Sequence, residues 1–139
     1  MHAREEVEAD PVYDHLLVSR RMPNHYNSFG LDHEALRSRY GTNPAFLHPD
    51  DLRALGLAKG QRIEIASRHG RIAGVAWPDP GLRRGLVSIS HAWGDNPDVE
   101  DPTGALGANT GRLMRVDVDY DPYSGIPRMS ALPVSIRPV

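Results

Sequence analysis

The sequence predicts a small, mainly β domain of the barrel type. Three observations favour this class: short apolar runs with strand-like patterning, twelve prolines and thirteen glycines in 139 residues, and a lack of segments that could form the crossover helices of a parallel α/β sheet. Frequent proline and glycine indicate short elements joined by tight turns. We expect five or six short strands, two small helices and long loops.

The chain begins with a polar, acidic segment, residues 1–11, which we expect to be a mobile lead-in to a domain spanning residues 12–139. Residues 12–19 cluster apolar side chains between polar flanks and are predicted to form the first strand. Residues 20–30 contain too much Pro, Asn and Gly for a regular element, so a long loop is expected there.

Two short helices and an extended segment are predicted next. Asp32 is a suitable cap for a helix reaching about Arg39. The Asn43-Pro44 dipeptide favours an extended segment over residues 45–48. A second helix starts at Pro49, where a missing N–H costs nothing, and two carboxylates in its first turn suit the helix dipole. Its buried side is expected to consist of Leu52, Leu55 and Leu57.

The second half of the chain is predicted to be a series of strands. Residues 61–67 alternate, with Ile63 and Ile65 on one face, and a turn at His69-Gly70 leads to a returning strand over residues 71–77. Further strands are expected over residues 86–90, 115–119 and 130–137. Residues 95–111 show little periodicity, and a loop of that length in a compact domain is usually functional or disordered. Residues 121–127 are rich in turn formers.

Composition excludes several classes of function. The net charge of −2 gives no general attraction to nucleic acid or membrane, and no apolar run reaches the roughly 20 residues of a membrane helix. The N-terminal segment does not resemble a secretory signal. Cysteine is absent, which removes disulfides, thiolate metal sites and a cysteine nucleophile, and fits a reducing compartment. We therefore expect a cytoplasmic protein without nucleic-acid or membrane partners.

Three loops contain side chains suited to a ligand that has phosphates and a ring system. Asn matches the edges of heterocycles, loop N–H groups and hydroxyls can hold phosphate, and Trp or Tyr can stack on a ring. Each residue also has a structural alternative: Trp93 can pack in the core, Asn27 and Asn109 can stabilise turns, and Arg21 can pair with an acidic neighbour. The candidates are Arg20, Arg21, His25, Tyr26, Asn27 and Ser28 in the first loop, His91 and Trp93 in the second, and Asn109 and Thr110 in the third.

Two other kinds of site have weaker support. Seven histidines are present, but no pair has the H-x-x-x-H spacing of a helical zinc site, so we expect no metal ligated by this chain. Ser90, His91 and Asp95 include the residue types of a catalytic triad, but the G-x-S-x-G nucleophile elbow is missing. We therefore expect no catalytic residues in this chain.

An ordered series of motifs across residues 12–138 resembles the C-terminal cofactor-binding domain of the molybdopterin-dinucleotide oxidoreductases, the dimethyl-sulfoxide-reductase family. In this family a Ser/Thr-x-Arg strand end and an aromatic, polar loop come first, followed by an "HP-D" helix with a Leu-Gly turn. A Ser-x-x-Gly hairpin, a His-x-Trp-Gly segment, a Gly-x-Asn-x-x-Leu loop and a closing DP-x-S/T-G-x-P segment complete the series. Here these motifs are residues 19–21 and 25–28, 48–60, 67–70, 91–94, 107–113 and 121–127.

The resemblance implies a six-stranded double-psi β-barrel with two or three short helices. Its loops would clasp the pterin and dinucleotide of a molybdopterin guanine dinucleotide, in which molybdenum or tungsten is held by the cofactor and not by this chain. Where the family often has a basic residue after the closing motif, this chain has Met129 and Ser130, and Arg128 is the candidate substitute. The residues assigned to cofactor binding are Arg21, His25, Asn27, Ser28, His91, Trp93, Asn109 and Arg128.

The resemblance also implies a partner. The family, which includes formate dehydrogenase- and nitrate reductase-like enzymes, holds its metal with a side chain from another domain, and this chain has no cysteine motif for an iron–sulfur cluster. We therefore expect a fragment or small subunit that works with the remaining catalytic domains or subunits and is not catalytic alone. The alternative is a protein- or peptide-binding double-psi barrel, such as the adaptor-binding domains of certain AAA ATPases, which share the helix and glycine turn. A self-cleaving pyruvoyl decarboxylase is disfavoured because no Gly-Ser dipeptide occurs.

Overall fold

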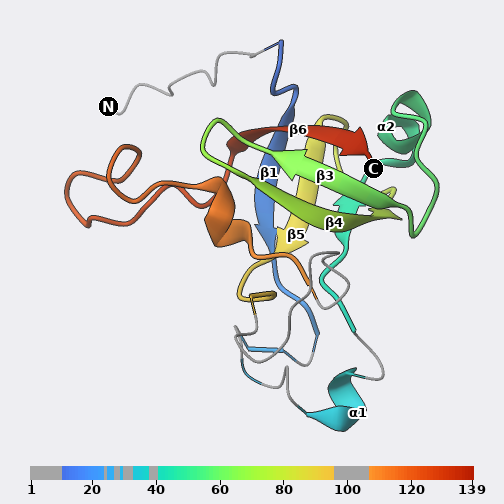
Figure 1. Cartoon of the computed structure of the whole chain (residues 1–139), viewed down its shortest axis with the longest axis horizontal. Coiled ribbons are helices and arrows are strands. Elements are labelled where there is room, and N and C mark those ends of the chain that lie inside the picture. Colours follow the sequence, from blue (N-terminus) through green and yellow to red (C-terminus); the bar gives the residue numbers. More distant parts are fainter. Residues whose placement is uncertain (1–10, 24, 27–28, 30–32, 38–40, 96–106) are drawn as a thin grey trace.

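A computed structural model describes residues 11–23, 25–26, 29, 33–37, 41–95 and 107–139. Six strands close into a barrel, with very little helix outside it (Figure 1). The strands are β1 His15–Arg20, β2 Ala45–Leu47, β3 Arg62–Ala66, β4 Arg71–Pro78, β5 Leu86–Ser90 and β6 Leu132–Pro138. The helices are α1 Glu34–Arg37, α2 Pro49–Ala54 and the 3₁₀ helix η1 Thr110–Leu113. The predicted six-stranded, mainly β barrel with two or three short helices is confirmed.

The strand order around the barrel is β1-β5-β2-β4-β3-β6, and it mixes parallel and antiparallel neighbours. β1 runs parallel to β5, with Leu17 opposite Val87, and β2 runs parallel to β4, with Ala45 opposite Ala76. The other four neighbouring pairs are antiparallel. Parallel neighbours cannot be joined by a tight hairpin, so the chain must cross over between them, as the double-psi arrangement requires.

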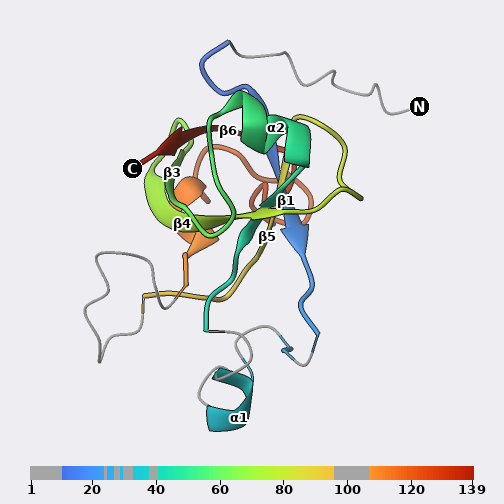
Figure 2. The same ribbon diagram turned by 90° about the vertical axis from the view of Figure 1, so that its right-hand side faces the viewer.

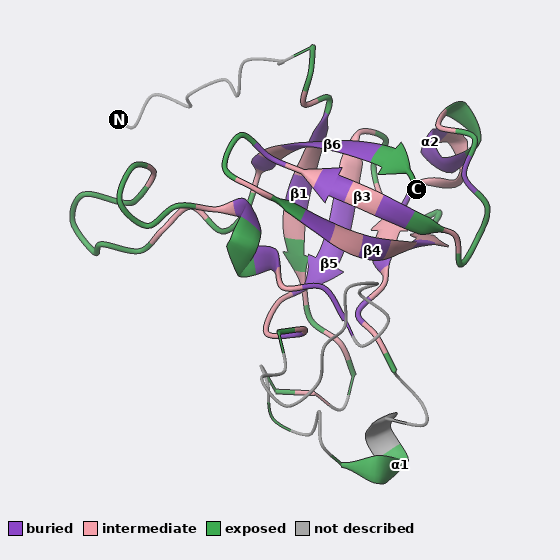
Figure 3. Ribbon diagram, viewed as in Figure 1, coloured by how far each residue is buried: buried purple, intermediate pink, exposed green. Residues whose placement is uncertain are grey.

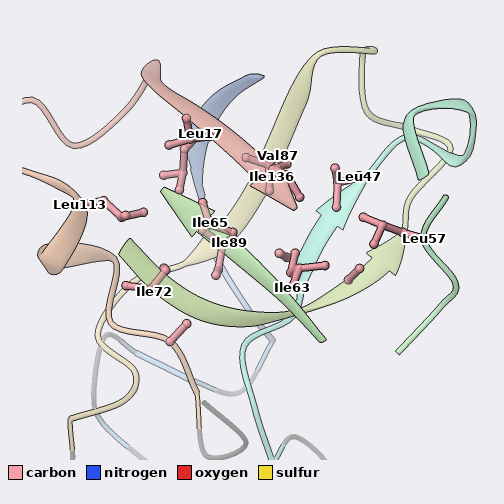
Figure 4. Close-up of a cluster of buried hydrophobic side chains, with 14 of the residues drawn as sticks. Leu17, Leu47, Leu57, Ile63, Ile65, Ile72, Val87, Ile89, Leu113 and Ile136 are labelled. Atoms are coloured by element: carbon pink, nitrogen blue, oxygen red, sulfur yellow. The ribbon is translucent and has the colours of Figure 1, made fainter. Parts of the chain in front are cut away.

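The barrel interior is a continuous apolar core. Buried and partly exposed residues alternate along β3 and β4, as period-two strands with one face inward must (Figure 3). Ile63 and Ile65, which the sequence places on one face, are completely buried. Each such side chain contributes about 1.5–3 kcal/mol through removal from water. Side chains from all six strands and from η1 meet in this core, among them Leu17, Leu47, Ile72, Val87, Ile89, Leu113 and Ile136 (Figure 4).

Helix α2 begins as its sequence predicts. The Nδ1 atom of His48 accepts a hydrogen bond from the backbone N–H of Asp50 (3.0 Å) and caps the helix, and Pro49 occupies the first turn. Leu52 and Leu57 are buried, whereas Leu55 is half-buried against the same core. The expected apolar side of this helix is therefore confirmed.

The predicted hairpin between β3 and β4 is present, and its glycine is required by a close contact with a distant segment. Gly70 does not have a positive φ. A Cβ atom at Gly70 would lie 2.1 Å from the backbone oxygen of Arg112, so the position must be glycine because η1 packs directly on the turn. The Ser67 hydroxyl strengthens this contact by donating to the Leu113 carbonyl oxygen (2.6 Å).

The strand predicted over residues 115–119 is wrong. These residues form a turn in which Val116 and Val118 are 68% and 55% exposed, and the side chain of Arg115 bonds to Asp117. The Val-x-Val pattern has no partner strand, because the closed barrel offers no free edge beside it.

Two further boundaries differ from the prediction. The first strand begins at His15 and not at residue 12, and Val12 is exposed. Helix α1 is described only over Glu34–Arg37, while its expected cap Asp32 and end Arg39 lie outside the described residues. Residues 1–10 also lie outside them, so the mobile lead-in remains a prediction. Within the described part of the chain, no helix is long and apolar enough to cross a membrane.

Candidate functional site

The loops that contain the candidate residues leave the barrel at one end. Strands β1 and β5 are parallel and stay paired to their last residues, Arg20 and Ser90, so the segments that follow them start side by side. The segment that leads into β2 enters the barrel at the same end, because β2 is antiparallel to β5 and its first residues lie beside the last residues of β5. Figures 1 and 2 show these segments below the barrel in both views, on the same side as α1.

The first two loops meet through two rings. The imidazole of His25 and the indole of Trp93 have centroids 5.1 Å apart and planes inclined at 48°. Nδ1 of His25 also lies 3.3 Å from the backbone oxygen of Pro23. Trp93 is only 5% exposed, and its buried indole N–H has no hydrogen-bond partner among the described residues. A buried donor without a partner costs about 1–3 kcal/mol, so a ligand atom that accepted from it would recover that energy.

The second and third loops meet backbone to backbone. Gly94 has φ +74°, and a Cβ atom there would lie 2.8 Å from the oxygen of Gly107 and 2.9 Å from the nitrogen of Asn109. Gly107 has φ +118°, and its Cβ would lie 3.0 Å from two carbon atoms of Trp93. Only glycine fits at either position, both for its conformation and for this close approach.

Asn43 links the same two loops through hydrogen bonds to their backbone. Its side chain is 1% exposed, and Nδ2 donates to the backbone oxygens of Ser90 (2.6 Å) and Ala108 (2.9 Å). Its Oδ1 accepts from the N–H of Ala108 (2.7 Å). In the sequence, Asn43 stands out only as the residue before a proline. The sequence signal that could have revealed it is an Asn close to an apolar strand, because an amide that is buried there is almost always paired.

Asn109 is partly committed to local structure. Its Oδ1 accepts from the N–H of Gly111 (2.9 Å) and caps η1, while its Nδ2 donates to Asp95. Arg112 donates to the same carboxylate through Nε (2.8 Å) and lies 2.7 Å from its other oxygen through Nη2. The hydrogen bond from Arg112, followed by that from Asn109, holds the pKa of Asp95 below its ordinary value although partial burial opposes the shift. The turn-stabilising alternative for Asn109 is therefore observed, and one N–H and one lone pair of its amide have no partner among the described residues.

Arg20, which the sequence analysis grouped with the first loop, has a structural role. Its guanidinium lies 3.8 Å above the ring of Phe46 and donates to Asp79 (2.7 Å). The hydrogen bond from Arg20 lowers the pKa of the Asp79 carboxyl, and the N–H of Gly81 lowers it further. These contacts tie the end of β1 to β2 and to the turn after β4.

The remaining candidates are not all brought together. Arg21 is exposed, with its guanidinium 5.9 Å from the ring centroid of Tyr26, and His91 is half-buried directly after β5. Arg128 lies in the loop before β6, which Figure 1 shows projecting from the side of the barrel; it is 3.8 Å from Asp119 and lines a surface hollow of about 430 Å³. Asn27 and Ser28 lie outside the described residues. Among the described residues, no three His, Cys, Asp or Glu side chains gather as a metal site would need.

The geometry defines a ligand-binding barrel whose polar loops gather at one end. The sequence matches the family described as "Molydopterin dinucleotide binding domain" over residues 16–133. The chain therefore belongs to the molybdopterin dinucleotide-binding domain family, and the cofactor of this family is the molybdopterin dinucleotide. The resemblance found in the sequence motifs is confirmed.

A solved structure has the same fold. Acetylene hydratase from Pelobacter acetylenicus is similar to this chain with a TM-score of 0.78 and 24% sequence identity. The similarity covers 91% of this chain and 18% of the acetylene hydratase chain. This chain thus spans less than a fifth of the length of the protein that it resembles.

The donor set at the loop end fits a dinucleotide of this kind. The indole N–H of Trp93 is a buried donor with no partner among the described residues, and the amide of Asn109 retains a donor and an acceptor. Arg21 adds an exposed guanidinium, which suits phosphate. Hydrogen-bond donors, a heterocycle-matching amide and a cation are the groups that a pterin and a diphosphate need.

Proposed function

We propose that this chain clasps the pterin and the phosphates of a molybdopterin guanine dinucleotide within a molybdenum or tungsten oxidoreductase. The observation that supports this most is the meeting of the three loops at the end of the barrel, through the His25–Trp93 rings and the Gly94–Gly107 contact. A clasp needs loops from separate parts of the chain at one place, and the closed barrel supplies that place.

The residues would divide the work by their chemistry. Arg21, together with Asn27 and Ser28, would bind phosphate oxygens through charge-assisted and neutral hydrogen bonds. His25, His91 and Trp93 would border the pterin, and Trp93 would donate its indole N–H. The spare donor and acceptor of the Asn109 amide would pair with the edge of the pterin ring. Arg128 would add a cation only if the ligand extends toward the loop before β6.

The contribution of this chain is binding and orientation. When bound, the cofactor supplies the metal and the redox chemistry, because the protein's share in such enzymes is placement and electrostatics. The buried surroundings of Trp93 would exclude water from one side of the ligand. The loops after β1 and β5 would fix its angle to the barrel, since both start from paired, rigid strands.

We further propose that the partner is the remaining catalytic part of such an oxidoreductase. The loop between η1 and β6 supports this, because it exposes a series of large apolar side chains and contains two internal ion pairs, Arg115–Asp117 and Arg128–Asp119. Surfaces of this kind on a domain are usually covered by another part of the protein. The exposed side chains are Val116, Val118, Tyr120, Tyr123, Ile126 and Met129. We also propose a cytoplasmic location, which is supported only by the amino-acid composition.

The alternative function, a peptide-binding adaptor barrel, gains no support. It would share the helix α2 and its glycine turn, but it needs neither the Trp93 contacts nor the Asn109 amide.

A chemical-shift titration tests the proposed function. ¹⁵N-labelled chain is titrated with the oxidised, metal-free form of molybdopterin guanine dinucleotide, and in parallel with guanosine diphosphate, which lacks the pterin. We expect shifts concentrated in residues 21–26, 91–95 and 107–112, larger for the complete dinucleotide. Saturable shifts around α2 and β3, with none at the loops, would contradict the proposal.

A further inference from the structure

The carboxylate of Asp95 joins two of the three loops at the candidate site. Asp95 follows Gly94 in the loop after β5, and it accepts hydrogen bonds from Asn109 and Arg112, at the start and within the span of η1. Both carboxylate oxygens are used, because Arg112 approaches one with Nε at 2.8 Å and the other with Nη2 at 2.7 Å. A bidentate Arg–carboxylate pair of this kind adds geometric specificity as well as energy.

The partners of Asn109 decide which way its amide faces. At one end the Gly111 N–H can only donate, so it requires the amide oxygen. At the other end the ionised Asp95 carboxylate can only accept, so it requires the amide nitrogen. When the amide turns over, its oxygen and nitrogen exchange places together, so each partner disfavours the turned-over form and Asp95 adds its preference to that of Gly111. With both present, this orientation is held at both ends, and among the described residues one N–H and one lone pair of the Asn109 amide have no partner.

Stability does not explain this arrangement. The side chains of Asp95 and Arg112 are 38% and 63% exposed, and ion pairs with that exposure contribute about 0–1 kcal/mol. The junction of the two loops is already fixed by the Asn43 bonds and the Gly94–Gly107 contact beneath. Asp95 also has φ +53°, a conformation that non-glycine residues rarely adopt. The carboxylate is thus held at this place with little gain in stability.

We infer that Asp95 is a positioning residue for ligand binding: together with the Gly111 N–H it holds the Asn109 amide in one orientation, and this orientation selects for the hydrogen-bonding pattern of the pterin edge. This inference rests on the proposed function. Asp95 itself does not contact the ligand; it acts through Asn109. The pKa of Asp95, held below its ordinary value by Arg112 and then by Asn109, keeps the carboxylate ionised at neutral pH, where it accepts and does not donate.

The test compares Asp95→Asn with a matched control. Asp117→Asn removes the carboxylate of the Arg115–Asp117 pair, which is also exposed (53% and 59%) and has no part in the site. Affinity for oxidised, metal-free molybdopterin guanine dinucleotide is measured by the anisotropy of the pterin fluorescence. We expect roughly tenfold weaker binding for Asp95→Asn, because the Asn109 amide loses the charge-assisted hydrogen bond that holds it in the binding orientation. For Asp117→Asn we expect no change in affinity. Thermal unfolding should be the same for both variants.

A double-mutant cycle separates positioning from direct binding. In an Asn109→Ala background, Asp95→Asn should weaken the affinity no further, because the amide on which Asp95 acts has gone. The Asn109 side-chain amide should also exchange its protons with solvent faster in Asp95→Asn than in the wild type, which needs no ligand to observe. If the wild type binds and Asp95→Asn binds as tightly, or if the two losses add, the inference about Asp95 is overturned and the proposed function stands. If the wild type does not bind, the proposed function fails, and the inference fails with it.

Discussion

The ring of His25 lies against the indole of Trp93, with 5.1 Å between centroids, although the two residues are 68 positions apart by their numbers. The parallel pairing of β1 with β5 brings them together, because the loops that follow both strands start at the same end of the barrel. This contact places Trp93 where the first two loops meet. Its indole N–H is buried without a partner among the described residues.

Two substitutions at Trp93 separate packing from hydrogen bonding. Trp93→Phe keeps an aromatic ring and removes the unpaired N–H, so the free energy of unfolding should change by less than about 1.5 kcal/mol. Trp93→Ala should cost about 3–5 kcal/mol because it leaves a cavity. Urea unfolding measures both. Losses of equal size would show that the N–H has a partner in the folded domain.

Gly70→Ala should destabilise the domain by about 2 kcal/mol or more, because its Cβ would lie 2.1 Å from the Arg112 oxygen and η1 would have to move. Gly81→Ala is the matched control: neither position has a positive φ, and the Gly81 Cβ would meet only the end of the Asp79 side chain at 3.2 Å. Melting temperatures of the two variants check this. A larger loss for Gly81→Ala would count against the packing of η1 on the hairpin.

Asn43→Ala should be among the most destabilising polar substitutions, at about 3 kcal/mol or more. It leaves the buried backbone oxygen of Ser90 and the buried backbone N–H of Ala108 without the hydrogen-bond partner that Asn43 supplies. Asn109→Ala, which removes a half-exposed cap, should cost about 1 kcal/mol. Denaturant unfolding of both variants gives the comparison. A larger loss of unfolding free energy for Asn109→Ala than for Asn43→Ala would contradict the role of Asn43.

The stability of the domain should depend on Asp51 in acid. Burial opposes ionisation of this carboxyl, but the N–H of Gly85 (2.6 Å), the side chain of Arg84 (3.0 Å) and nearby His15 outweigh it and lower the pKa below 3.8. A lowered pKa in the folded state contributes stability above the unfolded value, and this stability is lost as the pH falls through the folded value.

Asp51→Asn should therefore lower the free energy of unfolding at pH 7 and flatten its dependence on pH below about 4. Urea unfolding of wild type and variant between pH 2 and pH 7 measures this. Parallel pH profiles for the two proteins would show that Asp51 is not the group responsible.

The elements that could be predicted from sequence are those whose signals are local. The cap and proline of α2, the alternation around Ile63 and Ile65, and the glycine turn after α2 need no knowledge of distant residues. The Val116–Val118 pattern failed because a strand also needs a partner edge, and the closed barrel leaves none there.

For the site, the sequence grouped residues by loop but could not show which loops meet. The contact of His25 with Trp93 depends on strand pairing, and the roles of Asn43 and Asp95 depend on residues 65 and 14 positions further along the chain. Gly70 shows the same limit, because the atom that excludes its side chain belongs to Arg112.

The central claim is that the loop end of the barrel binds a molybdopterin dinucleotide. The most direct measurement is the fluorescence of Trp93 in a Trp77→Phe variant, where it is the only tryptophan, during titration with oxidised, metal-free molybdopterin guanine dinucleotide. Trp93 emission should change saturably at ligand concentrations below about 1 mM, and the additional substitution Asn109→Ala should weaken this binding. An emission that stays constant while the chain remains folded would contradict the claim.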